Sequence, residues 1–531
     1  MSLTRISILL GLVVAGVVAA ELPQIRMENG VGQLIVNGKP FLIFGGELGN
    51  SSAGTAAQAD TILPNMARLH VNTVLMPVAW EQVEPKEGSF DFSILDHWIE
   101  AARQQKVRLV LLWFGSWKNA FSEYAPDWVK SDTKRFPRAM SATGLPLEIL
   151  STFGAETLRL DSRAFAALMS HLRETDRDQQ TVLMVQIENE VGYLGSGRDR
   201  SAEADRQFNA PVPQELIRAL QEKQGRLSPE LAAHFNPKGN TWQEVFAEAA
   251  NEVFMSWRYA GFMDAVAKAG KKEYALPMFV NAQLPAFMER PGEYPSGGPH
   301  PYYLDVYRAT AANIDFYSPD IYWPEFEYWV KRYQIPGNPI FIPEARIEQS
   351  PFNALYAFGS GKAFGFCPFA VDSLRADANP VLMQTYSALE ALGELLPAAQ
   401  VAGKTRGMVL HESSARGTQT VSLGGYLFEG SLSHAWRTNT LLANDGGMLV
   451  LQSGTDEFLV IGSGLTVRMT RDPDTDARIA GIASIEQLTR TPSGWNVTHR
   501  LNGDQSNQGR QLTMDSQQVR IYRLRLYAAS R

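Results

Sequence analysis

Eight short apolar runs alternate with longer amphipathic stretches between about residues 38 and 395, and this alternation limits the possible folds more than any other feature. Most of the runs are nearly continuous in apolar residues, as expected of parallel strands that are buried on both faces. They lie at residues 41–47, 72–78, 107–113, 181–187, 277–281, 314–319, 339–344 and 363–369. Intervening stretches such as 92–105 have the apolar spacing of amphipathic helices. The pattern predicts an α/β fold, a (β/α)₈ (TIM) barrel.

A doubly wound open sheet is the alternative α/β architecture. Such a sheet favours a Gly-x-Gly-x-x-Gly turn after its first strand, where a phosphate group binds. Residues 45–49 occupy that place here and read Gly-Gly-Glu-Leu-Gly, which lacks the spacing. The barrel is therefore the preferred prediction.

The pattern changes after about residue 397. Apolar and polar residues alternate from Leu465 to Met469, and Gly, Asp, Asn and Ser cluster between the apolar runs. Both features predict antiparallel strands of a β-sandwich. We therefore expect a barrel with a short N-terminal hairpin at Asn37-Gly38 over residues 21–396, and a separate β-sandwich domain over 397–531.

The first twenty residues are typical of an export signal. Arg5 precedes a short apolar run that ends in Val18-Ala19-Ala20, and this arrangement predicts cleavage after Ala20. The alternative is an uncleaved membrane anchor, but the run is shorter than the roughly 20 apolar residues that a bilayer span needs. We expect an exported protein, periplasmic or extracellular, with no membrane contact after signal cleavage.

Charge and cysteine content narrow the possible partners. The formal charge is −7 and no basic run is present, whereas nucleic acids and anionic membranes select clustered Lys and Arg. Cys367 is the only cysteine and lies in an apolar stretch, so we expect buried packing and no internal disulfide. The eight histidines show no metal-binding spacing, so neither a metal nor another cofactor is expected. The oligomeric state stays open.

Two glutamates follow largely apolar strands, Glu190 after the fourth and Glu344 at the end of the seventh. Reactive side chains of a (β/α)₈ barrel lie at the C-terminal ends of its strands, and these two strands face one cavity from opposite sides. Hydrolysis of a glycosidic bond requires such a pair: an acid for the leaving oxygen and, in retaining enzymes, a carboxylate nucleophile. The alternative for each glutamate is a salt-bridged residue at the barrel mouth.

The segment 186–192 reads Gln-Ile-Glu-Asn-Glu-Val-Gly, and residues 80–88 read Trp-Glu-Gln-Val-Glu-Pro-Lys-Glu-Gly before Phe-Asp-Phe at 90–92. This ordered set resembles clan A glycoside hydrolases, and specifically the family 35 β-galactosidases. The resemblance covers about residues 35–370. The β domain, including 456–458 and 501–504, is similar to the tail of one bacterial branch of that family.

The resemblance implies a retaining exo-β-galactosidase that removes terminal β-galactosyl residues from oligo- or polysaccharides through a covalent glycosyl-enzyme. It implies that Glu190 is the acid/base, that Glu344 is the nucleophile and that Asn189 contacts the sugar 2-hydroxyl. Strand alternation places Glu188 and Glu190 on one side and Asn189 on the other, so the strand must bulge or end at about 188 for Asn189 and Glu190 both to reach substrate. Glu188 is the rival acid, and Glu190 is preferred because it lies nearer the barrel mouth.

Four further residues are candidates for substrate contact. By the same resemblance, Tyr322 could donate a hydrogen bond to Glu344. Trp113 and Trp323, like Tyr322, could form flat platforms for the apolar faces of sugar rings. Glu47, at the end of the first strand, could bind a sugar hydroxyl.

The sequence departs from family 35 in two places. Val191 replaces the usual Tyr, and residues 113–117 (Trp-Phe-Gly-Ser-Trp) stand where many members have an Ala-Glu pair that holds sugar hydroxyls. The alternatives are therefore another clan A β-glycosidase (a glucosidase, a xylanase-like or an endo-acting enzyme) or a non-catalytic carbohydrate-binding protein.

Overall fold

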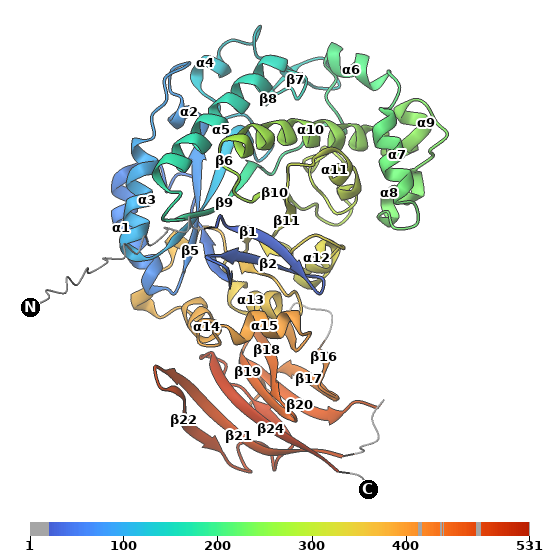
Figure 1. The fold of residues 1–531 in the computed structure, drawn as a ribbon. Coiled ribbons are helices and arrows are strands. Elements are labelled where there is room, and N and C mark those ends of the chain that lie inside the picture. Colours follow the sequence, from blue (N-terminus) through green and yellow to red (C-terminus); the bar gives the residue numbers. More distant parts are fainter. Residues whose placement is uncertain (1–20, 413–416, 436–437, 439, 474–478, 530–531) are drawn as a thin grey trace, which may run out of the picture.

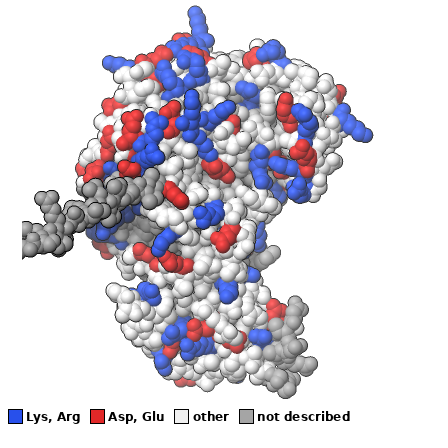
Figure 2. Space-filling model, viewed as in Figure 1, with Lys and Arg blue, Asp and Glu red and all other residues white. Residues whose placement is uncertain are grey.

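The structure is a computed structural model that describes residues 21–412, 417–435, 438, 440–473 and 479–529. Figure 1 shows a barrel domain joined through α13, α14 and α15 to a C-terminal β domain. The predicted export signal lies outside the described residues. Within the described part of the chain, no helix has the length and apolarity needed to cross a bilayer. On the face drawn in Figure 2, cationic and anionic side chains are interspersed over both domains.

The central sheet is parallel throughout and closes on itself. Its strands, in spatial order, are β4 (Ile43–Glu47), β5 (Thr73–Ala79), β6 (Arg108–Lys118), β9 (Val182–Asn189), β10 (Met278–Gln283), β11 (Phe316–Ile321), β13 (Glu344–Ala345), β12 (Phe341–Ile342) and β14 (Gly365–Phe366). β12 and β13 are two pieces of one strand, interrupted at Pro343, which has no N–H for the ladder. β13 pairs with β11, β12 pairs with β14, and β14 pairs with β4. The predicted (β/α)₈ barrel is confirmed.

Helices follow the barrel strands and cover the outside of the sheet (Figure 1). Those in the first half are α1 (Ala56–Arg68), α2 (Trp80–Val83), α3 (Ser93–Gln105), α4 (Asp127–Lys130) and α5 (Ala155–Thr175). The connection after β9 carries α6 (Ala202–Phe208), α7 (Gln214–Glu222), α8 (Pro229–His234), α9 (Trp242–Phe246) and α10 (Ala250–Glu273). The last helices are α11 (Leu304–Thr310), α12 (Phe326–Tyr333), α13 (Ser350–Gly359), α14 (Val381–Glu390) and α15 (Leu395–Val401). A short hairpin of β7 (Arg138–Met140) and β8 (Pro146–Leu150) lies between α4 and α5.

Alternate residues of each strand face two different cores. In β6, Leu112 and Phe114 belong to a cluster inside the barrel, whereas Leu111 and Trp113 belong to the layer between sheet and helices. The inner cluster also contains Leu34 of β2 (Val31–Val36), so the N-terminal sheet of β1 (Gln24–Glu28), β2 and β3 (Lys39–Phe41) adds to the barrel core.

Cys367 is buried in the inner cluster, as predicted. Burial raises the pKa of its thiol well above the usual value, which keeps it protonated. A packing role therefore fits this side chain better than a reactive one.

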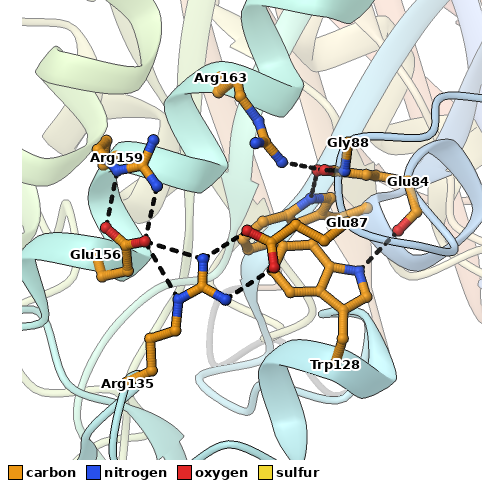
Figure 3. A network of polar contacts seen from close by, with 9 residues as sticks. Glu84, Glu87, Gly88, Trp128, Arg135, Glu156, Arg159 and Arg163 are labelled. Atoms are coloured by element: carbon orange, nitrogen blue, oxygen red, sulfur yellow. Dashed lines mark hydrogen bonds and ion pairs between the residues drawn. The ribbon is translucent and has the colours of Figure 1, made fainter.

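An ion-pair network ties the loop after α2 to α5 (Figure 3). Glu84 is fully buried; it accepts a hydrogen bond from the Gly88 backbone N–H at 2.6 Å and pairs with Arg163 of α5. Arg135 bridges Glu87, at 2.5 Å, and Glu156 of α5, at 3.0 Å. Exposed pairs contribute about 0–1 kcal/mol each, so the buried Glu84 is the stronger anchor of α5.

The β domain consists of two packed antiparallel sheets. One has the order β15 (Thr405–His411), β18 (Asp445–Gly454), β19 (Glu457–Ser463), β24 (Arg520–Ala529), β21 (Ile479–Thr491) and β22 (Gly494–Leu501). The other has the order β16 (Thr418–Leu423), β17 (Tyr426–Leu432), β20 (Leu465–Arg471) and β23 (Gln511–Thr513). Phe428 and Phe458 belong to the core between them. The backbone of β18 approaches α13 so closely that a Cβ at Gly447 would lie 2.9 Å from Phe352 Cβ.

Candidate active site

A cavity of about 330 Å³ opens at the C-terminal ends of the barrel strands. Carboxylates, an ammonium group, amides and aromatic rings from seven of the strands or the loops after them line it. The lining residues are Asn50, Lys118, Asn119, Glu190, Gln283, Leu284, Asp320, Tyr322, Trp323, Glu344 and Phe369. Of the residues selected from the sequence, Glu190, Glu344, Tyr322 and Trp323 are in this set.

The structure brings Glu190 and Glu344 together. One carboxyl oxygen of each, and one of Asp320, all lie within 4.8 Å of one another. Both glutamates are only 4% exposed, so their charges interact through little solvent. Three acidic side chains at such distances could hold a cation, but Lys118 lines the same cavity and already supplies a positive charge.

The end of β9 aims Glu190 into the cavity. Glu188 and Glu190 have φ values of 57° and 45°, a left-handed conformation that costs about 1–3 kcal/mol for residues other than glycine and is common at functional sites. The Glu190 backbone N–H donates to Asn281 Oδ1 at 3.0 Å, which holds this turn. The regular alternation of side-chain directions along β9 is therefore interrupted at residues 188–190, where the sequence predicted a bulge or the end of the strand.

Burial raises the pKa of Glu190 to about 7, and the negative charge of Glu344 adds to the effect. Lys118 and a hydrogen bond with Asp320 act in the opposite direction. A carboxyl group with this pKa can give up and take back a proton at neutral pH, as an acid/base residue must.

Glu344 begins β13, directly after Pro343. The hydroxyl of Tyr322 donates a hydrogen bond to Glu344 Oε1. Burial and the charge of Glu344 raise the pKa of Tyr322 far above its usual range, so Tyr322 stays protonated and remains a donor. The expected Tyr322–Glu344 contact is therefore present.

Glu47 is fully buried and does not line the cavity, contrary to the expected contact with a sugar hydroxyl. Burial and the charge of Glu344 raise its pKa well above the usual value, so Glu47 is a neutral acid. Both oxygens of Glu47 and Oε2 of Glu344 have no other hydrogen-bond partner among the described residues. A proton on Glu47 would therefore let it donate to the candidate nucleophile.

Two further residues, Lys118 and Asp320, belong to the site but were not predicted from the sequence. Asp320 lies one residue before the end of β11, the sixth strand, and accepts a hydrogen bond from Asn281 Nδ2 at 2.6 Å. Burial and the carboxyls of Glu344, Glu190 and Glu47 raise its pKa. Burial alone would lower the pKa of Lys118, but the surrounding carboxyls raise it overall: Glu344, Glu190, Glu47 and Asp320. Asp320 could have been predicted, because it directly follows an apolar run and reactive residues of a barrel lie at the C-terminal ends of strands. Lys118 lies five residues beyond the predicted end of its strand.

Asn189 connects Lys118 to the acid/base candidate. Its Oδ1 accepts a hydrogen bond from Lys118 Nζ at 2.9 Å, and its Nδ2 has no hydrogen-bond partner among the described residues. Asn189 is fully buried and is not among the residues that line the cavity, so its expected contact with the sugar 2-hydroxyl stays a prediction.

Trp113 does not reach the cavity, and its expected role as a sugar platform is not supported by its position. Its ring packs against Phe165 of α5, with centroids 5.6 Å apart, and its indole N–H donates to Asp161 Oδ1 at 2.9 Å. Trp323, in contrast, lines the cavity and is held by a 3.0 Å hydrogen bond to the Leu284 carbonyl.

Glu188 is fully buried away from the cavity. Its Oε2 accepts the Trp117 backbone N–H at 2.8 Å, and its carboxyl group contacts Asp161 of α5. Between the two rival acids, the geometry favours Glu190.

Residues 51–227 match the glycoside hydrolase family 42 model, whose description is beta-galactosidase. The match includes Asn189 and Glu190 and ends before Glu344, so the first half of the barrel matches a glycoside hydrolase domain. Family 35 itself, expected from the motifs, stays a prediction. Residues 382–513 match a domain of unknown function, DUF5597. No curated protein matches the chain.

Several solved glycosidase structures are similar at low identity. The β-galactosidase of the psychrophilic Marinomonas ef1 shares 13% identity, with 64% of this chain and 58% of that chain covered and a TM-score of 0.43. The cold-adapted β-galactosidase of Rahnella sp. R3 shares 15%, with 69% and 58% covered and a TM-score of 0.44. The β-mannanase of the blue mussel Mytilus edulis shares 13%, with 69% and 97% covered and a TM-score of 0.42. The chain thus spans 58% of the length of the two β-galactosidases.

Proposed function

We propose that this protein is a retaining exo-β-glycosidase, of β-galactosidase type, in which Glu344 is the nucleophile and Glu190 the acid/base. The observation that carries the proposal is the separation of 4.8 Å or less between oxygens of the two carboxyl groups. Retaining enzymes place these groups about 5–5.5 Å apart, whereas inverting enzymes need about 6.5–9.5 Å to admit a water molecule.

In the first step, an oxygen of Glu344 attacks the anomeric carbon while the bond to the leaving oxygen breaks. Glu190 gives its proton to that oxygen, so the aglycone leaves as an alcohol. Tyr322 donates to Glu344, as protonated Glu47 would, and these contacts orient its carboxylate before the attack. The products are a glycosyl ester of Glu344 and ionised Glu190.

In the second step, Glu190 removes a proton from a water molecule whose oxygen attacks the anomeric carbon, and the ester bond to Glu344 breaks. The charge of Glu344 contributes to the raised pKa of Glu190, and esterification removes that charge. Glu190 is therefore a weaker acid in the intermediate, which suits its change from acid to base. Two displacements return the sugar with its original configuration.

Two observations support a galactosyl residue held at the end of a glycan. The first half of the barrel matches a model described as beta-galactosidase. The cavity is near the lower end of the range for small-molecule sites, about 300–1,000 Å³, which suits a single sugar ring better than a long chain. The exposed part of Trp323 offers a flat face for that ring. Asn189 Nδ2, which has no hydrogen-bond partner among the described residues, is the proposed donor to its 2-hydroxyl.

The experiment compares Glu344→Gln with a matched substitution at another buried glutamate. Glu252 of α10 is 4% exposed and has its pKa raised by burial to about 7, but it lies outside this cavity. We expect Glu344→Gln to abolish turnover of nitrophenyl β-galactoside and Glu252→Gln to retain it. Equal activity of Glu344→Gln and the wild type would remove Glu344 from the mechanism. If a panel of nitrophenyl glycosides showed activity only on a glucoside or a xyloside, galactose would be wrong as the proposed substrate sugar, and the proposed mechanism would still stand.

We also propose that the chain is exported and cleaved after Ala20, on the strength of Arg5, the apolar run after it and the small residues before Glu21. N-terminal sequencing of the protein secreted by an expressing bacterium should begin at Glu21. A mature protein that retains residues 1–20 would contradict this proposal.

A further inference from the structure

A second pair of carboxyl groups lies behind the cavity, between the barrel wall and α5. Glu188 of β9 and Asp161 of α5 are both fully buried, and their carboxyl groups are in hydrogen-bond contact. Neither lines the cavity, and the proposed reaction uses neither of them. Burial of a carboxyl group without a cation is unfavourable in free energy, so other contacts must stabilise this pair.

The pair occupies a break in the ladder between β6 and β9. Trp113 pairs with Ile187 and Lys118 pairs with Asn189, so four residues of β6, 114–117, lie opposite the single residue Glu188. A bulge of this size leaves backbone N–H groups of β6 without partners on β9.

The two carboxyl groups supply the missing acceptors. The Trp117 N–H donates to Glu188 Oε2 at 2.8 Å. The Ser116 N–H and hydroxyl donate to Asp161 Oδ2 at 3.1 and 2.5 Å. A Cβ on Gly115 would lie 2.4 Å from Trp113 Nε1, which donates to Asp161, and 2.8 Å from both Asp161 Oδ1 and Glu188 Oε1, so the bulge fits closely around the pair.

One proton shared by the pair completes the hydrogen bonding. Burial and the charge of Asp161 raise the pKa of Glu188 well above its usual value. Asp161 also accepts from Ser116 and Trp113, so it is the better carboxylate and Glu188 carries the proton. Oε1 of Glu188 has no partner if both groups are treated as acceptors; as an O–H it donates to Asp161.

The end of the bulge sets the position of the candidate active-site residues. Directly after it, Lys118 Nζ reaches Asn189 Oδ1 at 2.9 Å, and the Ala120 N–H donates to the Glu190 carbonyl at 3.1 Å. The helix that carries Asp161 is itself anchored by the network of Figure 3, through Glu156 and Arg163. A displacement of the pair would therefore move the turn that holds the acid/base.

We propose that Glu188 and Asp161 are positioning residues: their hydrogen-bonded pair fixes the β6 bulge and thereby places Lys118, Asn189 and Glu190 for glycosyl transfer. This inference rests on the proposed function. It adds a role for the first glutamate of the 186–192 motif, which is to hold the second one in place.

The test uses leaving groups of different acidity, because a misplaced acid/base harms only substrates that need a proton on the leaving oxygen. Glu188→Met removes both hydrogen bonds at similar size, whereas Glu188→Gln keeps an acceptor for Trp117 and an N–H donor for Asp161. We expect Glu188→Met to lose about 10²-fold in kcat/KM on an alkyl β-galactoside, since small misplacements can cost that much. The loss on dinitrophenyl β-galactoside should be at least about tenfold smaller, and Glu188→Gln should stay close to wild type on both.

Gly115→Ala is the second variant, because it perturbs the pair without removing either carboxyl group. It should show the same selective loss of kcat/KM on the alkyl galactoside. If circular dichroism shows that Glu188→Met is unfolded, the Gly115→Ala result alone tests the positioning role. Equal losses on both substrates in the deciding variant, or a Glu188→Gln enzyme as impaired as Glu188→Met, would overturn the positioning role. A wild-type enzyme with no glycosidase activity would instead refute the proposed function.

Discussion

Glu190→Gln should stabilise the folded protein at alkaline pH while it removes acid/base catalysis. The pKa of Glu190 rises from its ordinary value of 4.5 to about 7 on folding, chiefly through burial. A group with a raised folded pKa contributes stability that is fully present below the unfolded pKa and is lost as the pH rises through the folded pKa. At about 1.4 kcal/mol for each pKa unit, ionised Glu190 costs the folded state about 3 kcal/mol above pH 8. Glutamine carries no charge and avoids this cost.

Thermal unfolding of the two proteins between pH 4 and pH 9 measures the effect. The two melting temperatures should nearly coincide below pH 4.5 and diverge through pH 7, with the glutamine variant several degrees higher at pH 8–9. Glu87→Gln is a control of opposite sign, because the ion pair with Arg135 lowers the pKa of the exposed Glu87. Its stabilising contribution is present above the unfolded pKa and is lost as the pH falls. A constant difference between wild type and Glu190→Gln at all pH values would refute the reasoning.

Three further substitutions test individual contacts of the site. Lys118→Met should raise the pKa of Glu190, because Lys118 lowers it, and the alkaline limb of the kcat/KM profile should move to higher pH; an unshifted limb would contradict this. Tyr322→Phe removes the donor to Glu344 and should lower kcat/KM by about 10–100-fold, the equivalent of about 1.5–3 kcal/mol for a hydrogen bond to a charged group. Trp323→Ala removes an aromatic face of the cavity and should raise KM for the galactoside; an unchanged KM would place the sugar elsewhere.

The barrel and its two principal carboxylates were predictable because they follow from backbone periodicity. Continuous apolar runs identify parallel strands, and in a closed parallel sheet the strand ends meet at one mouth. Glu190 and Glu344 sit at two of those ends, and the structure places them in one cavity. Asp320 could have been found in the same way, because it directly follows the apolar run 314–319.

The periodicity of the sequence does not predict where the side chains of Lys118, Trp113 and Glu47 lie. The bulge at 114–117 extends β6 and returns the chain to the cavity only at Lys118, and no local pattern in the sequence marks a bulge of that length. Trp113 ends the predicted strand, but alternation sends its ring toward α5, as the inward-facing Leu112 and Phe114 show. Glu47 also occupies a strand end, yet its carboxyl group is fully buried near Glu344 and does not line the cavity.

Covalent trapping tests the central claim most directly. A 2-deoxy-2-fluoro-β-galactosyl fluoride slows the breakdown of a glycosyl ester, so the labelled residue can be identified by mass spectrometry of peptides. We expect one fluorogalactosyl group on the peptide that contains Glu344, and none on the Glu344→Gln variant. A label on Glu190, or an active enzyme that hydrolyses β-galactosides and takes up no label, would contradict the assignment of Glu344 as the nucleophile of a retaining glycosidase.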